Sequence, residues 1–385
     1  MKHRILILLL ILLPIIGFSQ NTNENVLYVV DSIPIIEEPK EGFDVLTADE
    51  IDNVVVVKDK KVMQSSGYKD LDGIVYVFTK AYVKRPDSIK AIPTTKLMTK
   101  TNGTWFLDNN STPYSGKFID YYLTGTKQGE GIMFNGKLKG KRQLYYLNGI
   151  KSDEIEYANG ISNGLEQRFY EDGTLMQQGT FRNGKEIGVW EMYHPNGQLK
   201  QQTTFNENGE MDGESVSYYS TGEVKGKNVY KNGVYQKDKV NDKLFKLYNQ
   251  SQELYHQANY KGAIKKLDKA LDLDSNWAEG YFARGTMKLN DFQFEEAIKD
   301  FNKTLEIEPY FTKAYSNRAF AHIRKQELGN GRTLSESKDL QIMASKDVEI
   351  PQSELDKICA DLKKAVALGD DNMMVLEALE KYCKE

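Results

Sequence analysis

Histidine and cysteine are scarce in this chain, which limits the chemistry it can perform. Only four histidines and two cysteines occur in 385 residues, whereas metal sites and nucleophilic triads depend on clusters of such side chains. His194, His256 and His322 stand alone on different predicted elements. The sequence also lacks HExxH, GxSxG, P-loop and GxGxxG motifs. We therefore predict a non-enzyme with no catalytic residue, no cofactor and no metal.

Long apolar runs are absent after residue 16, and the run at the N-terminus is short. The stretch "MKHRILILLLILLPIIGFSQ" has a basic start, an apolar centre and two small residues, Gly17 and Ser19, at the spacing of a cleavage site. This pattern predicts a signal peptide over residues 1–19. The alternative is a membrane anchor, but the run is shorter than the ~20 residues of a spanning helix. We expect an exported protein without a transmembrane anchor. It should be either periplasmic or secreted, and one alternative is that it is attached peripherally to the outer membrane.

Basic charge is not in excess either. The formal net charge is −4, and loss of Lys2 and Arg4 with the signal peptide removes two positive charges, which takes it from −4 to −6. Proteins that bind nucleic acids present a dense basic patch, and none is visible in this sequence. The composition therefore argues against nucleic acid as the main partner.

Glycine, in contrast, is plentiful and periodic. Three glycine rows and one aromatic row repeat every 24 or 25 residues. The rows are Gly116, Gly140, Gly164, Gly188 and Gly213; Gly125, Gly149, Gly173, Gly197 and Gly222; Gly136, Gly160, Gly184, Gly209 and Gly233; and Tyr121, Tyr145, Phe169, Tyr193 and Tyr218. Asn-Gly pairs such as Asn183-Gly184 are typical of hairpin turns in which both central residues have positive φ. The period predicts an antiparallel meander of roughly ten strands.

Two phrases of this array, "MYHPNGQLK" and "RNGKEIGVW", resemble the MORN-repeat variant found in antitoxin-like proteins. The resemblance covers roughly a third of the chain and implies a β-repeat domain, which we place at 103–236. The many tyrosines could also form a sugar-binding surface, but their regular spacing favours packing across neighbouring strands.

From residue 244 onward a 34-residue period replaces the glycine rows, after a boundary at "KDKVNDK" (237–243). Tyr281 and Tyr315 are 34 residues apart, and so are Gly285 and Ala319. The stretch "AEGYFARGTMKLNDFQFEEAIKDFNKTLEIEP" resembles the tetratricopeptide (TPR) repeat, a pair of helices. Thr304 departs from the usual alanine of that repeat. The resemblance implies an α-solenoid of helix pairs over 244–385.

The third helix pair is interrupted. Its second helix, "ICADLKKAVALGD", arrives late and leaves a polar insertion at about 327–353. Three interpretations stay open for this insertion: a disordered surface loop, a partner-binding flap or a short extra helix. The last stretch, "NMMVLEALEKYCKE", fits the capping helix that closes repeat arrays.

The two cysteines lie on these last two helices. Cys359 precedes the turn near Asp370 by 11 residues, and Cys383 follows it by 13. At ~1.5 Å rise per residue both lie roughly 16–20 Å from the turn, so they should face each other in an antiparallel pair. Export would permit a disulfide, and two buried free thiols are the alternative.

Residues 26–100 form a separate head. Val54–Val57 and Ile74–Phe78 are short runs of β-formers, and Thr47 with Glu50 has the spacing of a capping box that would begin a brief helix over 48–53. The phrases "VLYVVDSIPI", "DEIDNVVVVKD" and "GIVYVFTK" resemble the plug domain of TonB-dependent receptors, with Ser32 in place of the usual glycine. The resemblance implies a small plug-like β-α-β-β fold. No receptor barrel is expected, because the remaining residues are repeats and helices.

These features predict a multidomain α+β chain: a plug-like head, an antiparallel β-meander and a C-terminal TPR solenoid. The predicted function is that of a non-enzymatic, exported protein–protein interaction scaffold or adaptor of the bacterial envelope, acting through the TPR groove and the β-repeat sheet. The expected partner is a protein or peptide, in one version part of an outer-membrane or periplasmic complex. The alternative is an antitoxin-like inhibitor that neutralises a toxin or hydrolase through the β array.

The first helix of each TPR pair lines the concave face, which gives a set of candidate groove residues. Aromatic residues in a groove are typical binding anchors, although these could instead pack on the terminal helix or on the insertion. The candidates are Tyr248, Gln252, Tyr255, Glu279, Phe282, Thr286, Lys313, Ser316 and Phe320.

Overall fold

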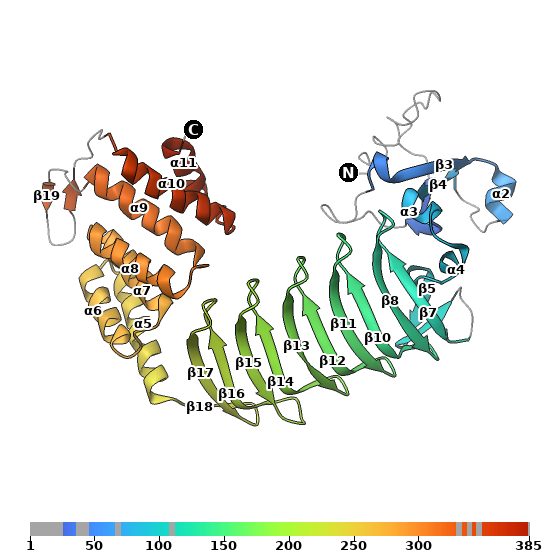
Figure 1. Cartoon of the computed structure of the whole chain (residues 1–385), viewed down its shortest axis with the longest axis horizontal. Helices are drawn as coiled ribbons and strands as arrows, with labels where there is room; N and C mark the ends of the chain where they lie inside the picture. Colours follow the sequence, from blue (N-terminus) through green and yellow to red (C-terminus); the bar gives the residue numbers. More distant parts are fainter. Residues whose placement is uncertain are drawn as a thin grey trace. The chain divides into compact units, whose positions relative to one another are not determined.

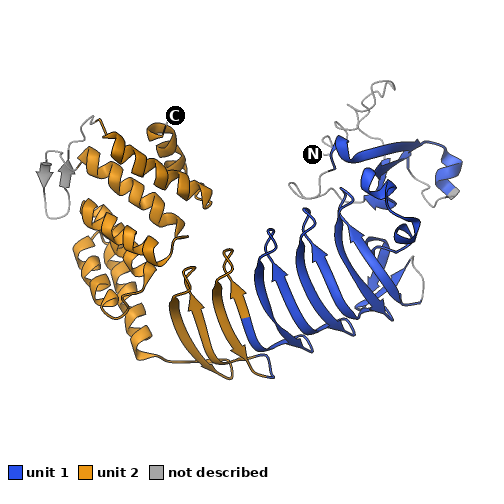
Figure 2. Cartoon of the chain, viewed as in Figure 1, with its two compact units in different colours: residues 1–190, 207–209 blue, residues 191–206, 210–385 orange. Residues whose placement is uncertain are grey.

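The computed structural model describes residues 26–35, 46–65, 71–107, 112–328, 333–336, 341–343 and 349–383 (Figure 1). The predicted signal peptide, residues 1–19, lies outside the described residues. The chain divides into two compact units, residues 1–190 with 207–209 and residues 191–206 with 210–385 (Figure 2). The first unit contains the head and the earlier β repeats, and the second contains the later repeats and the helices.

The head is a four-stranded sheet in the order β2-β1-β4-β3. β1 pairs in parallel with β4, while β2 and β3 are antiparallel to their neighbours. The strands are β1 (Val26–Val30), β2 (Ile33–Ile35), β3 (Ile51–Val57) and β4 (Gly73–Thr79). Val29, Met63 and Ile74 are buried together as its core.

This head has one strand more than the expected β-α-β-β unit. The capping box of Thr47 and Glu50 is present, but it caps only the 3-10 turn η1 (Ala48–Glu50). The residues from Ile51 onward, expected to be helical as far as 53, open strand β3 because they run into the four consecutive valines that favour extended backbone. The helix of the head is instead α2 (Lys60–Ser65), after β3. The resemblance to a receptor plug stays a prediction.

Short elements connect the head to the β repeats. They are α3 (Lys80–Val83), α4 (Asp87–Lys90), η2 (Thr95–Leu97) and the hairpin of β5 (Met98–Thr101) and β6 (Thr104–Leu107). Thr94 and Thr95 donate hydrogen bonds from their hydroxyls to the buried Asp120 carboxylate, at 2.7 and 2.9 Å. Met98 from the hairpin is buried with Phe118 and Met133 of the first repeat. The hairpin therefore covers the beginning of the repeat sheet.

The repeats form a 12-stranded antiparallel sheet whose strands follow one another in sequence order, except that β10 pairs with β8 and β9 lies off this path. The count exceeds the roughly ten strands expected because the short strands β9 and β18 also pair. The strands are β7 (Gly116–Tyr121), β8 (Lys127–Phe134), β9 (Lys137–Leu138), β10 (Gly140–Tyr145), β11 (Lys151–Ala158), β12 (Ile161–Phe169), β13 (Leu175–Arg182), β14 (Lys185–Tyr193), β15 (Leu199–Phe205), β16 (Met211–Tyr218), β17 (Val224–Lys231) and β18 (Val234–Gln236).

The two rows of turn glycines make different turns. Before Gly136 and Gly184 an asparagine also has positive φ, 49° and 51° at Asn135 and Asn183, as a type I′ turn requires. In the Gly125 row only the glycine has positive φ, and the strand register shifts next to the preceding aromatic, for instance between Leu144 and Tyr145. Asn-Gly therefore marks turns in both rows, but both residues have positive φ only in the Gly136 row, and not at Gly209, where Asn208 lacks it.

The C-terminal helices form three antiparallel pairs and a last helix. They are α5 (Lys239–His256) with α6 (Tyr260–Leu271), α7 (Ala278–Asn290) with α8 (Phe294–Ile307), α9 (Thr312–Leu328) with α10 (Gln352–Ala367), and α11 (Met373–Tyr382). Ala263, Ala297 and Phe301 are fully buried in the packing of these helices. Gly285 is needed at its position, because a Cβ there would lie 2.9 Å from Phe301.

Two segments differ from the expectation. The predicted boundary at 237–243 is mostly the first turn of α5, which begins at Lys239 with Asp238 as its cap. In the insertion, the described residues form a hairpin of β19 (Thr333–Glu336) and β20 (Gln341–Met343), not a short helix. The other residues between Leu328 and 349 lie outside the described part of the chain.

Within the second unit the last repeat packs directly on the helices. Tyr219, in the turn after β16, is buried against Ala278 and Ile307. Its hydroxyl accepts a 2.9 Å hydrogen bond from the Ala278 amide. The amide and hydroxyl of Ser220 both donate to the Glu308 carboxylate. The β repeats and the helices thus share one hydrogen-bonded interface in this unit.

Candidate functional site

The candidate site is a hollow between helices α7, α9 and the start of α11, with a volume of about 200 Å³. Side chains from all three helices line it, so it exists only once the helix pairs have stacked. The lining residues are Thr286, Leu289, Asn290, Lys313, Ser316, Asn317, Phe320, Arg324, Asp370, Asn372, Met374 and Val375. We call this set the groove hollow.

Helix α9 supplies a polar and cationic stripe to the groove hollow. Lys313, Asn317, Phe320 and Arg324 follow one another at intervals of four, three and four residues. At 3.6 residues per turn this spacing keeps them on one face of the helix. Within the described part of the chain, no ion pair involves the Arg324 guanidinium. The stripe therefore offers an available cation next to a half-buried aromatic ring.

Asp370 is the buried carboxylate of the hollow. Lys313 Nζ lies 2.8 Å from it, and the Ser316 hydroxyl donates a second hydrogen bond. Burial by itself would raise the pKa of Asp370, but these two donors hold it below its ordinary value. Asp370 therefore stays ionised and fixes Lys313 at the rim.

Helix α7 contributes amide and hydroxyl groups that are already oriented. Asn317 donates to the Thr286 hydroxyl at 3.0 Å, and that hydroxyl in turn donates to the Phe282 carbonyl. Asn290 donates to the Tyr255 hydroxyl at 3.0 Å. This network fixes side chains that can hydrogen-bond a peptide backbone.

The predicted aromatic anchors divide into two kinds. Tyr248 packs edge-on against Trp277 with ring centres 5.5 Å apart, and Phe282 lies 4.7 Å from Phe311. Both are half-buried in the helix packing. Phe320 belongs to the packing as well, but it also lines the groove hollow. Tyr248 and Phe282 therefore stabilise the array in addition to any role in binding.

Other predicted groove residues are held elsewhere. Glu279 forms an ion pair with Lys225 and accepts a hydrogen bond from Tyr219, so it lies at the junction with the last β repeat. Gln252 is half-buried on α5, one turn before Tyr255. Neither lines the groove hollow, whereas Thr286, Lys313, Ser316 and Phe320 do.

The sequence interpretation missed Asn290, Asn317 and Arg324. Asn290 and Arg324 each directly follow a buried residue, Leu289 on α7 and Ile323 on α9. The hollow is lined both by predicted residues, such as Thr286 and Ser316, and by Asn290, Asn317 and Arg324. The 34-residue spacing of Asn290 and Arg324 was a signal that could have identified them.

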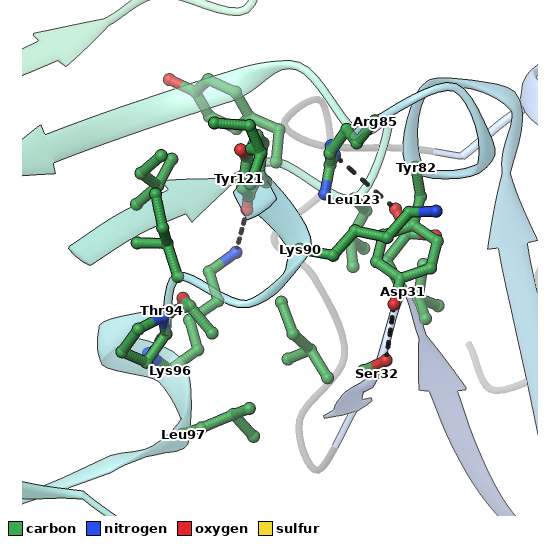
Figure 3. A pocket seen from close by; sticks show the side chains of 17 residues that line it. Asp31, Ser32, Tyr82, Arg85, Lys90, Thr94, Lys96, Leu97, Tyr121 and Leu123 are labelled. Carbon is green, nitrogen blue, oxygen red and sulfur yellow. Dashed lines mark hydrogen bonds and ion pairs between the residues drawn. The ribbon is translucent and has the colours of Figure 1, made fainter. Parts of the chain in front are cut away.

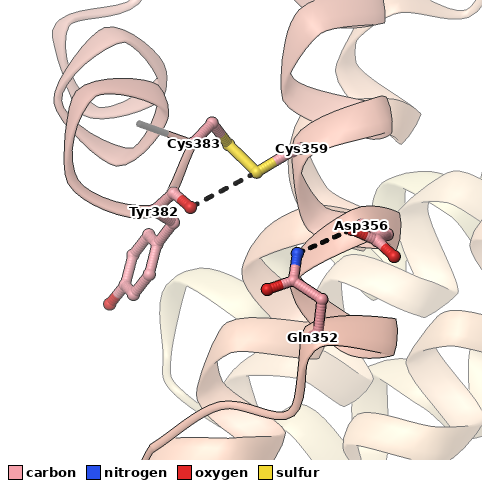
Figure 4. Close-up of a disulfide and its surroundings, with 5 residues drawn as sticks. All are labelled: Gln352, Asp356, Cys359, Tyr382 and Cys383. Carbon is pink, nitrogen blue, oxygen red and sulfur yellow. Dashed lines mark hydrogen bonds between the residues drawn. A yellow bond between two sulfur atoms is a disulfide. The ribbon is translucent and has the colours of Figure 1, made fainter. Parts of the chain in front are cut away.

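A disulfide holds the third wall of the hollow in place. Cys359 of α10 and Cys383 at the end of α11 are bonded, with Cα atoms 5.5 Å apart (Figure 4). This confirms the predicted pairing and excludes two free thiols. Cys359 Sγ also lies 3.4 Å from the Tyr382 carbonyl, which is a contact and not a hydrogen bond because a disulfide sulfur carries no proton. The bond fastens α11, and with it Met374 and Val375, to the last helix pair.

Two further observations bear on chemistry and location. In the described ranges, histidine, cysteine and carboxylate side chains do not gather in groups of three or more that could hold a metal ion. None of the helices in those ranges is both long and apolar enough to cross a membrane.

Three segments of the β array match the family model of the MORN repeat variant: residues 162–183, 186–207 and 211–232. The chain has no match among curated proteins. Among solved structures, it is similar to the first TPR of Spaghetti (RPAP3) bound to the HSP90 peptide SRMEEVD, with 20% identity, a TM-score of 0.29 and coverage of 37% of this chain and 91% of that chain.

Two further solved structures show similar scores. The TPR2B domain of yeast Sti1 in complex with an Hsp70 peptide has 19% identity, a TM-score of 0.29 and coverage of 37% of this chain and 97% of that chain. MamA has 14% identity, a TM-score of 0.27 and coverage of 35% and 64%. The family model therefore matches part of the β array, and the helices that follow it form the pairs described above.

Proposed function

We propose that this chain is a non-enzymatic interaction scaffold that holds a segment of a partner protein in the groove hollow. The observation that carries this proposal is the combination of Arg324, which has no ion-pair partner among the described residues, with Phe320 and exposed Met374 in one hollow. Structural ion pairs neutralise buried charge, and Arg324 has not been neutralised in this way. A cation beside apolar side chains can bind a partner segment, whereas the packing of the helices does not require it.

The chemistry of the hollow indicates the kind of segment it takes. Lys313 and Arg324 favour a carboxylate side chain, Phe320 and Met374 favour an adjacent apolar side chain, and Asn290 and Asn317 suit the peptide backbone. We therefore expect an extended or helical peptide that carries an acidic residue next to an aliphatic or aromatic one.

A peptide library displayed on phage and panned against the full chain tests this function. Enriched peptides should place Asp or Glu beside an apolar residue, and synthetic versions should bind about tenfold more weakly to Arg324→Gln, since one charge-assisted hydrogen bond is lost. Lys299→Gln is the matched control, because Lys299 lies on α8 with its side chain 75% exposed. Unchanged binding by Arg324→Gln with an unchanged melting temperature would refute the groove as the binding site.

A second candidate function uses the β repeats. Large apolar side chains are exposed on the strands of these repeats, and the exposed fractions are 53% for Ile132, 41% for Leu165 and 49% for Val189. Exposed apolar side chains suit contact with a partner surface, as an inhibitor of a toxin or hydrolase would need. Rescue of a co-expressed toxin that Leu165→Asp abolishes and Arg324→Gln leaves intact would favour this function over the first.

We propose that the protein is exported from the cytoplasm, is either periplasmic or secreted, and acts at the cell envelope. Its support is the predicted signal peptide at 1–19 together with the Cys359–Cys383 disulfide, because disulfides persist in oxidising compartments. Protein recovered from the periplasm or medium should contain no titratable thiol. Two free thiols per chain in such a preparation would contradict export in the oxidised form.

A further inference from the structure

A second cavity, of about 100 Å³, lies inside the first unit, between the head and the first β repeat (Figure 3). Its walls come from the β1–β2 turn, from the segment between α3 and η2, and from β7 with the turn that follows it. Most of the wall is apolar. The apolar side chains include Val30, Ile33, Ile89, Ile92, Ile119 and Leu123.

Positive charge is in excess around this cavity. Arg85, Lys90 and Lys96 line it, and among the described residues that line it Asp31 is the single carboxylate. Asp31 is already satisfied by Thr79, whose amide and hydroxyl donate to it at 2.8 and 2.7 Å. Lys96 is exposed and donates to the Tyr121 carbonyl, so Arg85 and Lys90 are the two cations that face this occupied carboxylate.

Arg85 is the most deeply buried of the three, with 12% of its side chain exposed. It stacks on the Tyr121 ring at 3.5 Å and donates one hydrogen bond to the Gly125 carbonyl at 2.7 Å. Asp31 lies 3.9 Å away, which is beyond hydrogen-bond distance. A guanidinium has five N–H donors, so most of those on Arg85 remain available to a guest in the cavity.

A purely structural role explains only part of this arrangement. Arg85 clearly fastens the Gly125 turn to the head. That role does not require Lys90, which is 26% exposed and lies 5.3 Å from the Tyr82 ring. Lys90 forms an ion pair at 3.6 Å with Asp87, whose carboxylate is fully exposed to water. Arg85 is a largely buried cation next to an apolar hollow, with Asp31 as its ion-pair partner, and a second anion there would stabilise it further.

We propose that this cavity binds a small monocarboxylate with an apolar body, its carboxylate held by Arg85 and Lys90 and its hydrocarbon part by the isoleucines and Leu123. Arginine binds carboxylates through two parallel hydrogen bonds. The volume is smaller than the ~150 Å³ of a cavity that accommodates benzene, so the guest is a short aliphatic acid. This site is separate from the groove hollow and does not depend on the function proposed for it.

Calorimetric titration of the full chain with acetate, butyrate and hexanoate tests the site. Affinity should rise by about fourfold for each methylene group that enters the cavity and then level off when it is full. Inorganic phosphate should bind more weakly than butyrate because it leaves the apolar walls unfilled. No saturable binding of any of the acids, or phosphate binding as tight as that of butyrate, would overturn the proposal.

Variants separate the site from the fold. Lys90→Gln should weaken butyrate binding several-fold, and Arg85→Lys, which keeps the charge but loses the forked donors, should weaken it by about tenfold. Lys84→Gln is the control, because Lys84 is an exposed lysine of the same segment that does not line the cavity. Even if Arg85→Lys fails to fold, Lys90→Gln remains decisive. Equal affinity in Lys90→Gln and in the control would overturn the proposal.

Discussion

Single side chains of the β repeats carry charge networks that hold neighbouring strands together. Glu154 on β11 is the clearest case, since Lys141, Lys151 and Gln143 all donate to it at 2.6 to 2.8 Å. These hydrogen bonds lower the pKa of Glu154 to about 2, from an ordinary value of 4.5. The carboxylate therefore links neighbouring strands, and its hydrogen bonds are strongest when it is ionised.

Glu154 should make the stability of the repeats depend on acid. Its pKa is lower in the folded than in the unfolded chain, so its contribution is present above about pH 4.5 and is lost as the pH falls towards about 2. We expect Glu154→Gln to be less stable than the wild type at pH 6 and equally stable near pH 2. Urea midpoints across this range measure the difference, and Glu171→Gln, at an exposed position, serves as the control. A difference that persists at the lowest pH would contradict this origin.

At the scale of the element, glycines within strands make room for large side chains. A Cβ at Gly179 on β13 would lie 2.1 Å from the Trp190 ring, which is itself buried against Phe181. Gly226 on β17 is also a strand glycine without positive φ, but a Cβ there would meet nothing closer than the Ser217 hydroxyl at 3.7 Å. The two positions have the same backbone type and differ in packing.

Gly179→Ala should therefore destabilise the repeats by about 1–3 kcal/mol, the usual cost of overpacking. Gly226→Ala should change stability by less than about 0.5 kcal/mol, as surface substitutions do. Chemical denaturation followed by tryptophan fluorescence compares them. Equal effects at the two positions would show that the loss comes from the glycine backbone and not from Trp190.

At the scale of the molecule, the turn after β16 joins the β repeats of the second unit to the helices. Tyr219 is 1% exposed, and burial raises the pKa of its hydroxyl. That hydroxyl accepts from the Ala278 amide, the first of α7, and donates to Glu279. Because of this interface, we expect the unfolding of the last β repeats to be coupled to that of the helices.

Tyr219→Phe keeps the packing and removes both hydrogen bonds. We expect a loss of about 1–3 kcal/mol, since the Ala278 amide is left buried without an acceptor, and faster hydrogen exchange at that amide. Exchange followed by mass spectrometry measures the change, with Tyr218→Phe as the control. Unchanged protection of the Ala278 amide would mean that the junction does not depend on this hydroxyl.

The sequence alone could predict the elements that recur with a fixed period and the features that neighbouring residues determine. The three glycine rows predicted the strands and their turns because positive φ is a property of the glycine itself. The 34-residue period predicted the helix pairs, and the spacing of Cys359 and Cys383 around Asp370 predicted their bond. The capping box at Thr47 was also recognised, although its helix was not, because the following valines favour a strand over propagation of the helix.

The tertiary structure decided everything that depends on which faces meet. The choice of Asn317 and Arg324 is fixed only when side chains of α7, α9 and the start of α11 meet around the groove hollow. The repeat pattern predicts Glu279 as a groove residue, yet its carboxylate forms an ion pair with Lys225, on a strand more than fifty positions earlier in the sequence. Arg85 likewise meets Gly125 across the boundary between head and repeats. Local periodicity fixes backbone conformation, whereas contacts between distant segments select which side chains stay free to bind.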